Sequence, residues 1–282
     1  MLNGLWPDRL SKFVMCKAFQ NKSMHDDPKI YKWHTELETM CLKNASVIVL
    51  NTSINNPPEI IQHLWNNCRL RVTVDGGANR WHTFITQNKL NCKNPDLISG
   101  DFDSATPTIV EYFVKRGSKL VHTPNQNETD FTKALKEVQK YSARQKIKIN
   151  KIIVMVNMYN RIDHFLSNIN TLYTQRDQFL DCKTILLGRN TMTWLLPPGL
   201  HSIQIPQILT AYPEKNYVGL FPMGSACESC TTTGLKWNIN GKMMQMGGLI
   251  SSSNTYNGDS VVTIANSSPL LWTMTLGFED DF

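Results

Sequence analysis

The sequence lacks the features that mark several large classes of protein. No apolar run approaches the roughly 18 residues that a membrane-spanning helix needs, and the N-terminus has no apolar core of the secretory type. Neither GxxxxGK(S/T) nor GxGxxG occurs, so any nucleotide is held without the common glycine-rich phosphate loops. We therefore expect a cytoplasmic protein with no membrane partner.

Cysteine is present in a number and spacing that do not suit a disulfide framework. The seven cysteines are an odd count scattered over 282 residues, which favours reduced thiols in an intracellular compartment. Cys227 and Cys230 form the only CxxC, with no second pair and no histidine at zinc-site spacing. We interpret them as ordinary cysteines.

The composition is that of a folded globular protein with room for two domains. Hydrophobic residues make up 41% and charged residues 18% of the chain. The net charge of +6 comes from the first 180 residues. That excess suits a polyanionic ligand such as a nucleotide, or it forms a solvated basic surface. No dense Lys/Arg block is interleaved with aromatic residues, so nucleic acid is not an expected partner.

Strand-like and helix-like segments alternate in the first part of the chain. Residues 1–44 are irregular, and we predict an N-terminal extension there. Strands are then predicted at 45–51, 70–74, 96–99 and 152–157, with helices near 57–68, 106–116, 129–141 and 162–173. Such alternation is typical of an α/β domain with a mainly parallel sheet, and we place that domain at 45–180.

The character of the sequence changes near residue 181. From there the chain is rich in Thr, Ser, Gly and short β-prone runs. Two Asn-Gly pairs, at 240–241 and 257–258, are typical of hairpin turns. We predict that residues 181–282 form a second, all-β domain, either a sandwich or a barrel, so that the fold class is α/β plus β.

Four aspartates stand where predicted strands end or where a helix begins: Asp75, Asp101, Asp103 and Asp130. The carboxyl ends of parallel strands line one crevice of an open sheet, which is the usual ligand site. Turn chemistry explains any one of these aspartates alone. Four together favour a site for Mg²⁺ and phosphate, because Mg²⁺ prefers carboxylate and phosphate oxygens.

Several segments, in this order, resemble thiamine pyrophosphokinases of the eukaryotic type. They are VDGGANR at 74–80, NPDLISGDFDS at 94–104, TPNQNETDFTKAL at 123–135, TTTGLKWN at 231–238, GLISSSNTY at 248–256 and PLLWTM at 269–274. Together they span about residues 45–276 of the chain. The resemblance implies pyrophosphoryl transfer from ATP to the hydroxyl of thiamine, with an α/β domain that binds ATP, a β-domain that contributes to thiamine binding, and a homodimer.

The resemblance also implies roles for individual residues. Mg²⁺ and the triphosphate would be held by Asp101, Asp103 and Asp130, with Asp75 beside them as a further catalytic residue. The ATP side would include Asn79, Arg80, Thr129, Arg161 and Asp163. Thiamine would contact Gln126, Trp237, Ser251, Ser253 and Asn254.

The chain departs from the family pattern before Arg161. The family is usually glycine-rich there, whereas this chain has Asn157, Met158, Tyr159 and Asn160. Asn tolerates positive φ better than most residues, which suits the turn, but Tyr159 adds bulk where the backbone would approach the nucleotide. The alternative function is therefore a catalytically weakened thiamine- or nucleotide-binding homologue.

Overall fold

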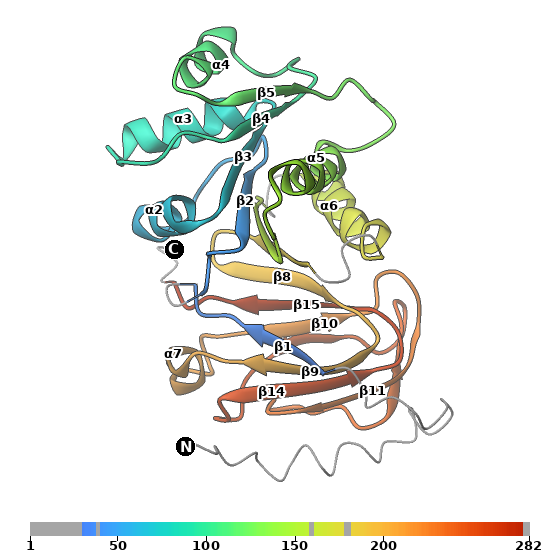
Figure 1. The fold of residues 1–282 in the computed structure, drawn as a ribbon. Helices are drawn as coiled ribbons and strands as arrows, with labels where there is room; N and C mark the ends of the chain where they lie inside the picture. Colours follow the sequence, from blue (N-terminus) through green and yellow to red (C-terminus); the bar gives the residue numbers. More distant parts are fainter. Residues whose placement is uncertain (1–29, 38–39, 158–160, 178–181, 279–282) are drawn as a thin grey trace.

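The computed structural model describes residues 30–37, 40–157, 161–177 and 182–278. They form a ten-stranded sheet with the order β13-β10-β15-β8-β7-β6-β2-β3-β4-β5 and a five-stranded sheet with the order β1-β9-β14-β11-β12 (Figure 1). None of the helices in these ranges has the length and apolar content that a bilayer span requires.

One half of the ten-stranded sheet is parallel. Its strands are β2 (Ala45–Val49), β3 (Leu70–Val74), β4 (Leu97–Gly100), β5 (Lys119–His122), β6 (Lys151–Met155) and β7 (Lys183–Leu187). Side chains alternate between the faces of a strand, and β2 is buried throughout because both faces are covered. Val47 and Val49 belong to one core cluster and Ile48 to the other.

Helices cover both faces of this parallel half. One face packs against α2 (Pro58–Asn67), α3 (Gly77–Gln87) and α4 (Pro107–Val114), and the other against α5 (Asp130–Gln145) and α6 (Ile162–Thr174) (Figure 1). The chain builds outward from β2 to β5 and then returns to place β6 on the other side of β2. The predicted α/β fold is confirmed; α3 and β5 were not predicted.

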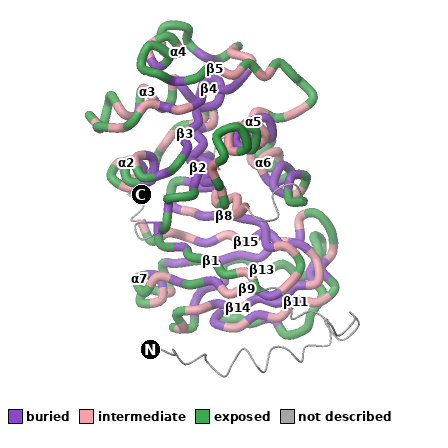
Figure 2. The backbone as a smooth tube through the Cα atoms, in the orientation of Figure 1, coloured by how far each residue is buried: buried purple, intermediate pink, exposed green. Residues whose placement is uncertain are grey.

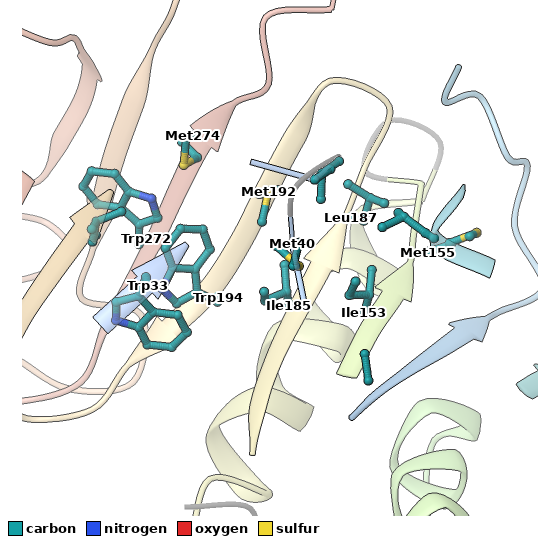
Figure 3. Close-up of a cluster of buried hydrophobic side chains, with 14 of the residues drawn as sticks. Trp33, Met40, Ile153, Met155, Ile185, Leu187, Met192, Trp194, Trp272 and Met274 are labelled. Carbon is teal, nitrogen blue, oxygen red and sulfur yellow. The ribbon is translucent and has the colours of Figure 1, made fainter. Parts of the chain in front are cut away.

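The rest of the chain forms a β-sandwich, which confirms the predicted β-rich part. It contains β8 (Thr191–Leu196), β9 (Gly199–Gln204), α7 (Gln207–Ala211), β10 (Val218–Phe221), β11 (Cys227–Thr233), β12 (Lys242–Met244), β13 (Ser251–Asn254), β14 (Val261–Asn266) and β15 (Leu270–Thr275). The five-stranded sheet packs on the antiparallel half of the larger sheet. Trp33 stacks on Trp194 with 5.1 Å between ring centroids, and Trp272 lies 6.1 Å from Trp194 (Figure 3).

The structure differs from the predicted limits of the N-terminal extension. Strand β1 (Ile30–His34) lies within residues 1–44 and pairs in parallel with β9. Trp33, the fourth residue of β1, is 6% exposed. The exposed Lys32 and His34 on either side of Trp33 make the segment look irregular in sequence, although they alternate with the buried side. Residues 1–29 lie outside the described residues.

The predicted boundary near residue 181 falls between β6 and β7 of the larger sheet. Strand β7 belongs to the parallel half, and β8 pairs with it in antiparallel fashion. A single sheet therefore crosses the limit, and its side chains share one core from Ile153 and Ile185 to Trp272 (Figure 3). The inner strands β2, β3 and β4 are buried along almost their whole length (Figure 2). The α/β part and the β part are thus joined by backbone hydrogen bonds as well as by the chain.

Only one of the two Asn-Gly pairs lies between antiparallel partners. Gly241, with φ of 60°, ends the 234–241 connection between β11 and β12, which pair with each other. Gly258, with φ of 100°, follows β13 and precedes β14, which belong to different sheets. The second hairpin prediction was therefore wrong, because a turn signal does not specify which strand becomes the partner.

His201 on β9 is a buried polar group that ties β1 to the sandwich. Its Nδ1 accepts a hydrogen bond from Trp33 Nε1 at 3.2 Å, and its Nε2 lies 2.8 Å from the carbonyl oxygen of Pro197. The ring is 1% exposed. Burial lowers its pKa from 6.5 to about 4, against a smaller opposing effect of the hydrogen bond to Pro197. The folded protein therefore holds this imidazole neutral.

We predict that His201 makes the protein lose stability as the pH falls from about 6.5 to 4. The unfolded chain binds the proton more readily than the folded chain in this window, which is worth at most about 3 kcal/mol in the free energy of unfolding. Urea unfolding of the wild type and of His201→Gln at pH 7.5 and pH 5 measures it. The variant should show a shallower pH dependence; equal slopes would contradict the assignment.

Candidate active site

The predicted acidic residues meet at the carboxyl edge of the parallel strands. Asp75 follows β3 directly, Asp101 and Asp103 follow β4, and Asp130 is the first residue of α5 after β5. Because β3, β4 and β5 are neighbours in the sheet, their ends lie side by side (Figure 1). The edge of the sheet, more than any local motif, brings these residues together.

Three carboxylates are close enough to bind one cation. Asp75, Asp101 and Asp103 each offer an oxygen within 4.8 Å of the others. The negative charge of Asp101, followed by that of Asp75, raises the pKa of Asp103. The pKa of Asp101 is instead lowered, chiefly because Gln126 Nε2 donates to its Oδ2 at 2.7 Å. The cluster thus concentrates negative charge that a cation would relieve.

Ser104 organises the buried side of the cluster. Its hydroxyl donates to Asp75 Oδ2 and accepts from the backbone N–H of Gly76 at 3.2 Å and from Asn51 Nδ2 at 3.1 Å. The backbone N–H of Asp75 donates to the carbonyl oxygen of Ser99 at 2.7 Å. Asp75 is 3% exposed, and its φ of 49° is unusual for a residue other than glycine. The loop after β4 therefore fixes the carboxylate that follows β3.

Two glycines allow the backbones to approach each other here. A Cβ on Gly77 would lie 2.3 Å from the carbonyl oxygen of Val49 at the end of β2. A Cβ on Gly100 would lie 2.9 Å from that of Asp75. Both distances are shorter than real contacts allow, so a larger residue at either position would push β2, β3 and β4 apart at the edge that carries the carboxylates.

The residues present fit a hard divalent cation. Asp75 Oδ1 is buried and has no hydrogen-bond partner among the described residues, whereas Oδ2 of the same carboxylate accepts from Ser104. Leaving a buried carboxylate oxygen unpartnered is costly. All three clustered side chains offer oxygen, the ligand atom that Mg²⁺ prefers. The donor set therefore matches Mg²⁺ in chemistry as well as in spacing.

Asp130, predicted as a metal ligand, is not in the group of three. Its Oδ1 lies 2.8 Å from Nζ of Lys133, one helical turn along α5. Asp130 nevertheless lies near enough to contribute to the raised pKa of Asp103. Its place among the metal ligands stays a prediction.

Three residues predicted on the ATP side, namely Asn79, Arg80 and Thr129, have partners within the protein. Asn79 donates to the carbonyl oxygen of Ser104 at 3.0 Å and accepts from the backbone N–H of Thr106 at 3.0 Å. Thr129 is the N-cap of α5 and accepts from the backbone N–H of Thr132 at 3.1 Å. Arg80 is exposed and donates from Nε to Asn51 Oδ1 at 3.1 Å. Asn79 therefore holds the loop after β4 in place, and Thr129 holds the first turn of α5.

Arg161 and Asp163 form a two-bonded ion pair at the start of α6. Arg161 Nε donates to Asp163 Oδ1 at 2.9 Å, and the guanidinium also binds Oδ2. The Arg161 guanidinium holds the pKa of Asp163 well below its usual range. Both side chains are exposed. The departure from the family pattern at 158–160 lies outside the described residues.

Three of the four predicted thiamine residues of the β part lie around a cleft of about 310 Å³. Trp237, Ser251 and Asn254 line it together with Leu249 and Ile250. The Trp237 side chain is 56% exposed, and the ammonium of Lys236 lies 4.7 Å from its ring centroid. An indole that already attracts one cation presents the surface that a thiazolium ring would use.

Ser253 does not line this cleft, although Ser251 and Ser253 were expected to share one face of a strand. The pairing of β13 with β10 shifts register between Val218 and Leu220, and Ser253 has a left-handed φ of 52°. The strand therefore turns before the alternation reaches Ser253, and Ser252 lines the cleft instead. Gln126, also predicted to contact thiamine, lies in the α/β part on Asp101.

Comparison with known families agrees with this division of the chain. Residues 61–184 match the family described as "Thiamin pyrophosphokinase, catalytic domain", and residues 200–271 match "Thiamin pyrophosphokinase, vitamin B1 binding domain". The rice protein "Thiamine pyrophosphokinase 1" is 35% identical over 242 residues, which are 82% of this chain and 87% of the rice protein. The chain belongs to the thiamine pyrophosphokinase family.

More distant members of the thiamine pyrophosphokinase family share the fold. "Thiamine pyrophosphokinase 2" of Arabidopsis thaliana is 30% identical over 84% of this chain and 88% of its own length. The structure of the Candida albicans thiamin pyrophosphokinase superposes with a TM-score of 0.76 at 21% identity, over 89% of this chain and 94% of that chain. The yeast structure gives 0.74 at 20% identity, over 89% and 92%.

Sequence reasoning missed three residues around the acidic cluster. Ser104 and Lys133 lie within the matching segments but were not singled out, and Asn51 ends the strand-like run ASVIVLN. A serine directly after two aspartates was an available signal for Ser104. Lys133 was predictable only as a helical residue, because its burial against Asp130 depends on the tertiary structure.

We predict that Asp103→Asn stabilises the cation-free protein near pH 7.5. The pKa of Asp103 is raised in the folded state, so ionised Asp103 lowers the free energy of unfolding at pH values above its ordinary pKa. This loss of stability should disappear as the pH falls and the carboxylate becomes protonated. Thermal unfolding in EDTA measures the gain, and added Mg²⁺ should stabilise the wild type more than the variant. Glu228→Gln, an exposed carboxylate on β11, is the control. A lower Tm for Asp103→Asn in EDTA would contradict the repulsion.

Proposed function

We propose that this protein transfers the pyrophosphoryl group of ATP to the hydroxyl of thiamine, giving thiamine diphosphate and AMP. The observation that carries the proposal is the cluster of Asp75, Asp101 and Asp103 at the edge of a parallel sheet, in a chain that matches both family domains. In the reaction the hydroxyl oxygen bonds to the β-phosphorus and loses its proton. The bond from the β-phosphorus to the α-phosphate oxygen breaks, and AMP leaves.

Mg²⁺ is the cofactor that we propose for the cluster, where Asp75, Asp101 and Asp103 would hold it. Bound Mg²⁺ supplies neutralisation of the charge on phosphate oxygens, which dominates this kind of transfer. Asp101 is oriented by Gln126, and Asp75 by Ser104. These hydrogen bonds fix the carboxylates before substrate arrives, so that little reorganisation is needed.

ATP is the co-substrate, and we place its phosphates at the carboxyl edge beside the cluster. Arg80 at the start of α3 and Arg161 at the start of α6 are exposed cations at this edge. Guanidinium groups suit phosphate oxygens because they offer several donors in one plane. Asp163, through its ion pair, orients Arg161. Positioning of this kind, without covalent participation by the protein, suffices for a loose phosphoryl-type transition state.

We place thiamine against Trp237, Ser251 and Ser252 in the cleft of the β part, with Asn254 holding the cleft together. Three exposed apolar side chains line it, namely Trp237, Leu249 and Ile250, and Met243 and Met246 of the same segment are exposed as well. An exposed apolar group of this kind marks a contact surface. It supports the proposal that the protein is a homodimer in which the cleft meets the acidic cluster of the partner.

Unpaired cysteines among the described residues suit a cytoplasmic location.

An assay with purified protein, ATP, Mg²⁺ and thiamine tests this function. AMP and thiamine diphosphate should appear in equal amounts. Thiamine binding without AMP would identify the weakened binding homologue instead, and absence of both would overturn the family-based assignment of substrate.

Replacement of one clustered carboxylate should abolish transfer while leaving thiamine binding intact. Asp101→Asn keeps the shape of the side chain but removes the charge that faces the cation. We expect kcat for AMP formation to fall by about 10²–10³-fold or more, measured by coupled detection of AMP. Glu111→Gln on α4, which pairs with Lys115, controls for loss of a surface carboxylate. Wild-type turnover in Asp101→Asn would refute the metal assignment.

Replacement of the exposed indole should act mainly on KM for thiamine. Trp237→Ala removes a cation–π contact worth about 0.5–2 kcal/mol, so KM should rise about 2- to 30-fold. Trp237→Phe should recover part of the affinity. Initial rates at varied thiamine and saturating ATP measure both variants. An unchanged KM in Trp237→Ala would show that thiamine binds elsewhere.

A further inference from the structure

Lys133 is a buried lysine beside the acidic cluster, on the first turn of α5. Its side chain is only 5% exposed, and lysine is rarely buried to this degree unless it is paired. The transfer reaction proposed above does not use its ammonium group. A charge buried to this degree requires partners of opposite charge or hydrogen-bond acceptors, and these partners indicate the role of Lys133.

The partners of Lys133 come from three different segments around the cluster. Nζ lies 2.8 Å from Asp130 Oδ1, donates to the carbonyl oxygen of Thr123 at 3.1 Å, and lies 3.9 Å from Asp101 Oδ2. Asp130 begins α5, Thr123 follows β5, and Asp101 follows β4. The ammonium thus joins the helix to two strand ends at the carboxyl edge.

Lys133 and Gln126 act on the same oxygen of Asp101. Gln126 Nε2 donates to Oδ2 at 2.7 Å, and the ammonium lies 3.9 Å from the same oxygen, within ion-pair distance. The other oxygen, Oδ1, accepts from the backbone N–H of Asp103 at 3.3 Å. Asp101 is therefore held in one orientation, between α5 and the carboxylates of Asp75 and Asp103.

We propose that Lys133 is a positioning residue that serves as the internal cation of the acidic cluster. It engages Asp130 and one side of Asp101, so that in the absence of nucleotide the cluster takes up a single divalent ion at Asp75, Asp101 and Asp103. The part of this inference that concerns turnover rests on the proposed function. The part that concerns cation binding depends only on the geometry.

This role has a consequence that a merely structural lysine would not have. A positive charge near the cation site repels the incoming cation, so its removal should tighten cation binding. The same removal frees Asp130 and leaves Asp101 less well oriented, so turnover should fall. Cation affinity and catalysis should therefore change in opposite directions, whereas simple loss of structure would weaken both.

The test is a titration of the full chain with Mn²⁺ alone, in which electron paramagnetic resonance measures how much Mn²⁺ is bound. The wild type should bind one Mn²⁺ per chain without nucleotide. Lys133→Met, which keeps the length but removes the charge, should bind Mn²⁺ at least about tenfold more tightly or take up a second ion. Lys133→Arg should keep the wild-type stoichiometry and affinity within about twofold. Unchanged or weaker Mn²⁺ binding by Lys133→Met would overturn the proposal.

Lys136→Met is the matched control. Lys136 lies on the same helix and pairs with Glu128 outside the group of three carboxylates, so its removal should leave Mn²⁺ binding as in the wild type. If Lys133→Met does not fold, Lys133→Gln replaces it, with the same expected direction. A control variant that tightens binding as much as Lys133→Met would reduce the effect to net charge and would also overturn the proposal.

Turnover measured on the same proteins distinguishes the proposed function from the role of Lys133. Lys133→Met should lower kcat for AMP formation by more than about tenfold, with partial recovery in Lys133→Arg. If the wild type forms no AMP but Mn²⁺ binding changes as expected, the proposed function fails and the role of Lys133 stands. If the wild type turns over but Lys133→Met matches it in kcat, the positioning role fails and the proposed function stands.

Discussion

Repulsion between Asp75, Asp101 and Asp103 is the interaction on which the rest of the site depends. Three carboxylates within 4.8 Å oppose folding unless donors or cations offset their charge. The fold supplies donors on each side: Ser104 under Asp75, and Gln126 with Lys133 on Asp101. None of these three comes from the strand that carries the carboxylate it serves. The cluster is thus held by tertiary structure and keeps a preference for an incoming cation.

The continuous ten-stranded sheet is what allows such a cluster to be held. Its parallel half places the strand ends, and its antiparallel half forms one layer of the sandwich. The shared core from Ile153 to Trp272 (Figure 3) gives the two halves one packing unit. A domain boundary drawn from composition at residue 181 passes through this sheet, because composition reports the change from helices to strands but not the pairing of β7 with β6.

Local signals predicted the parts of the site that depend on local structure. Thr129 caps α5, as its position before an apolar helical run indicated, and the aspartates stand at strand ends. Parts that depend on distant partners were not predictable: the burial of Lys133, the pairing of β1 with β9, and the register shift that turns Ser253 away from the cleft. In each case the residue type is compatible with several environments, and packing selects one.

Some residues of a family signature are free to contact a ligand, whereas others already use their hydrogen-bonding groups within the protein. Asn254 is 2% exposed; its Oδ1 accepts from the backbone N–H groups of Trp237 and Thr255, and its Nδ2 donates to the carbonyl oxygen of Trp237 and to Ser251. An amide can make about four such bonds, so none is left for thiamine. Asn254 therefore acts through Trp237, whose backbone it fixes and whose indole stays exposed. Asn79 has the same relation to the loop after β4. In both parts of the protein, a buried or half-buried asparagine hydrogen-bonds the backbone and so fixes a segment whose neighbouring side chain, Trp237 or Arg80, is exposed.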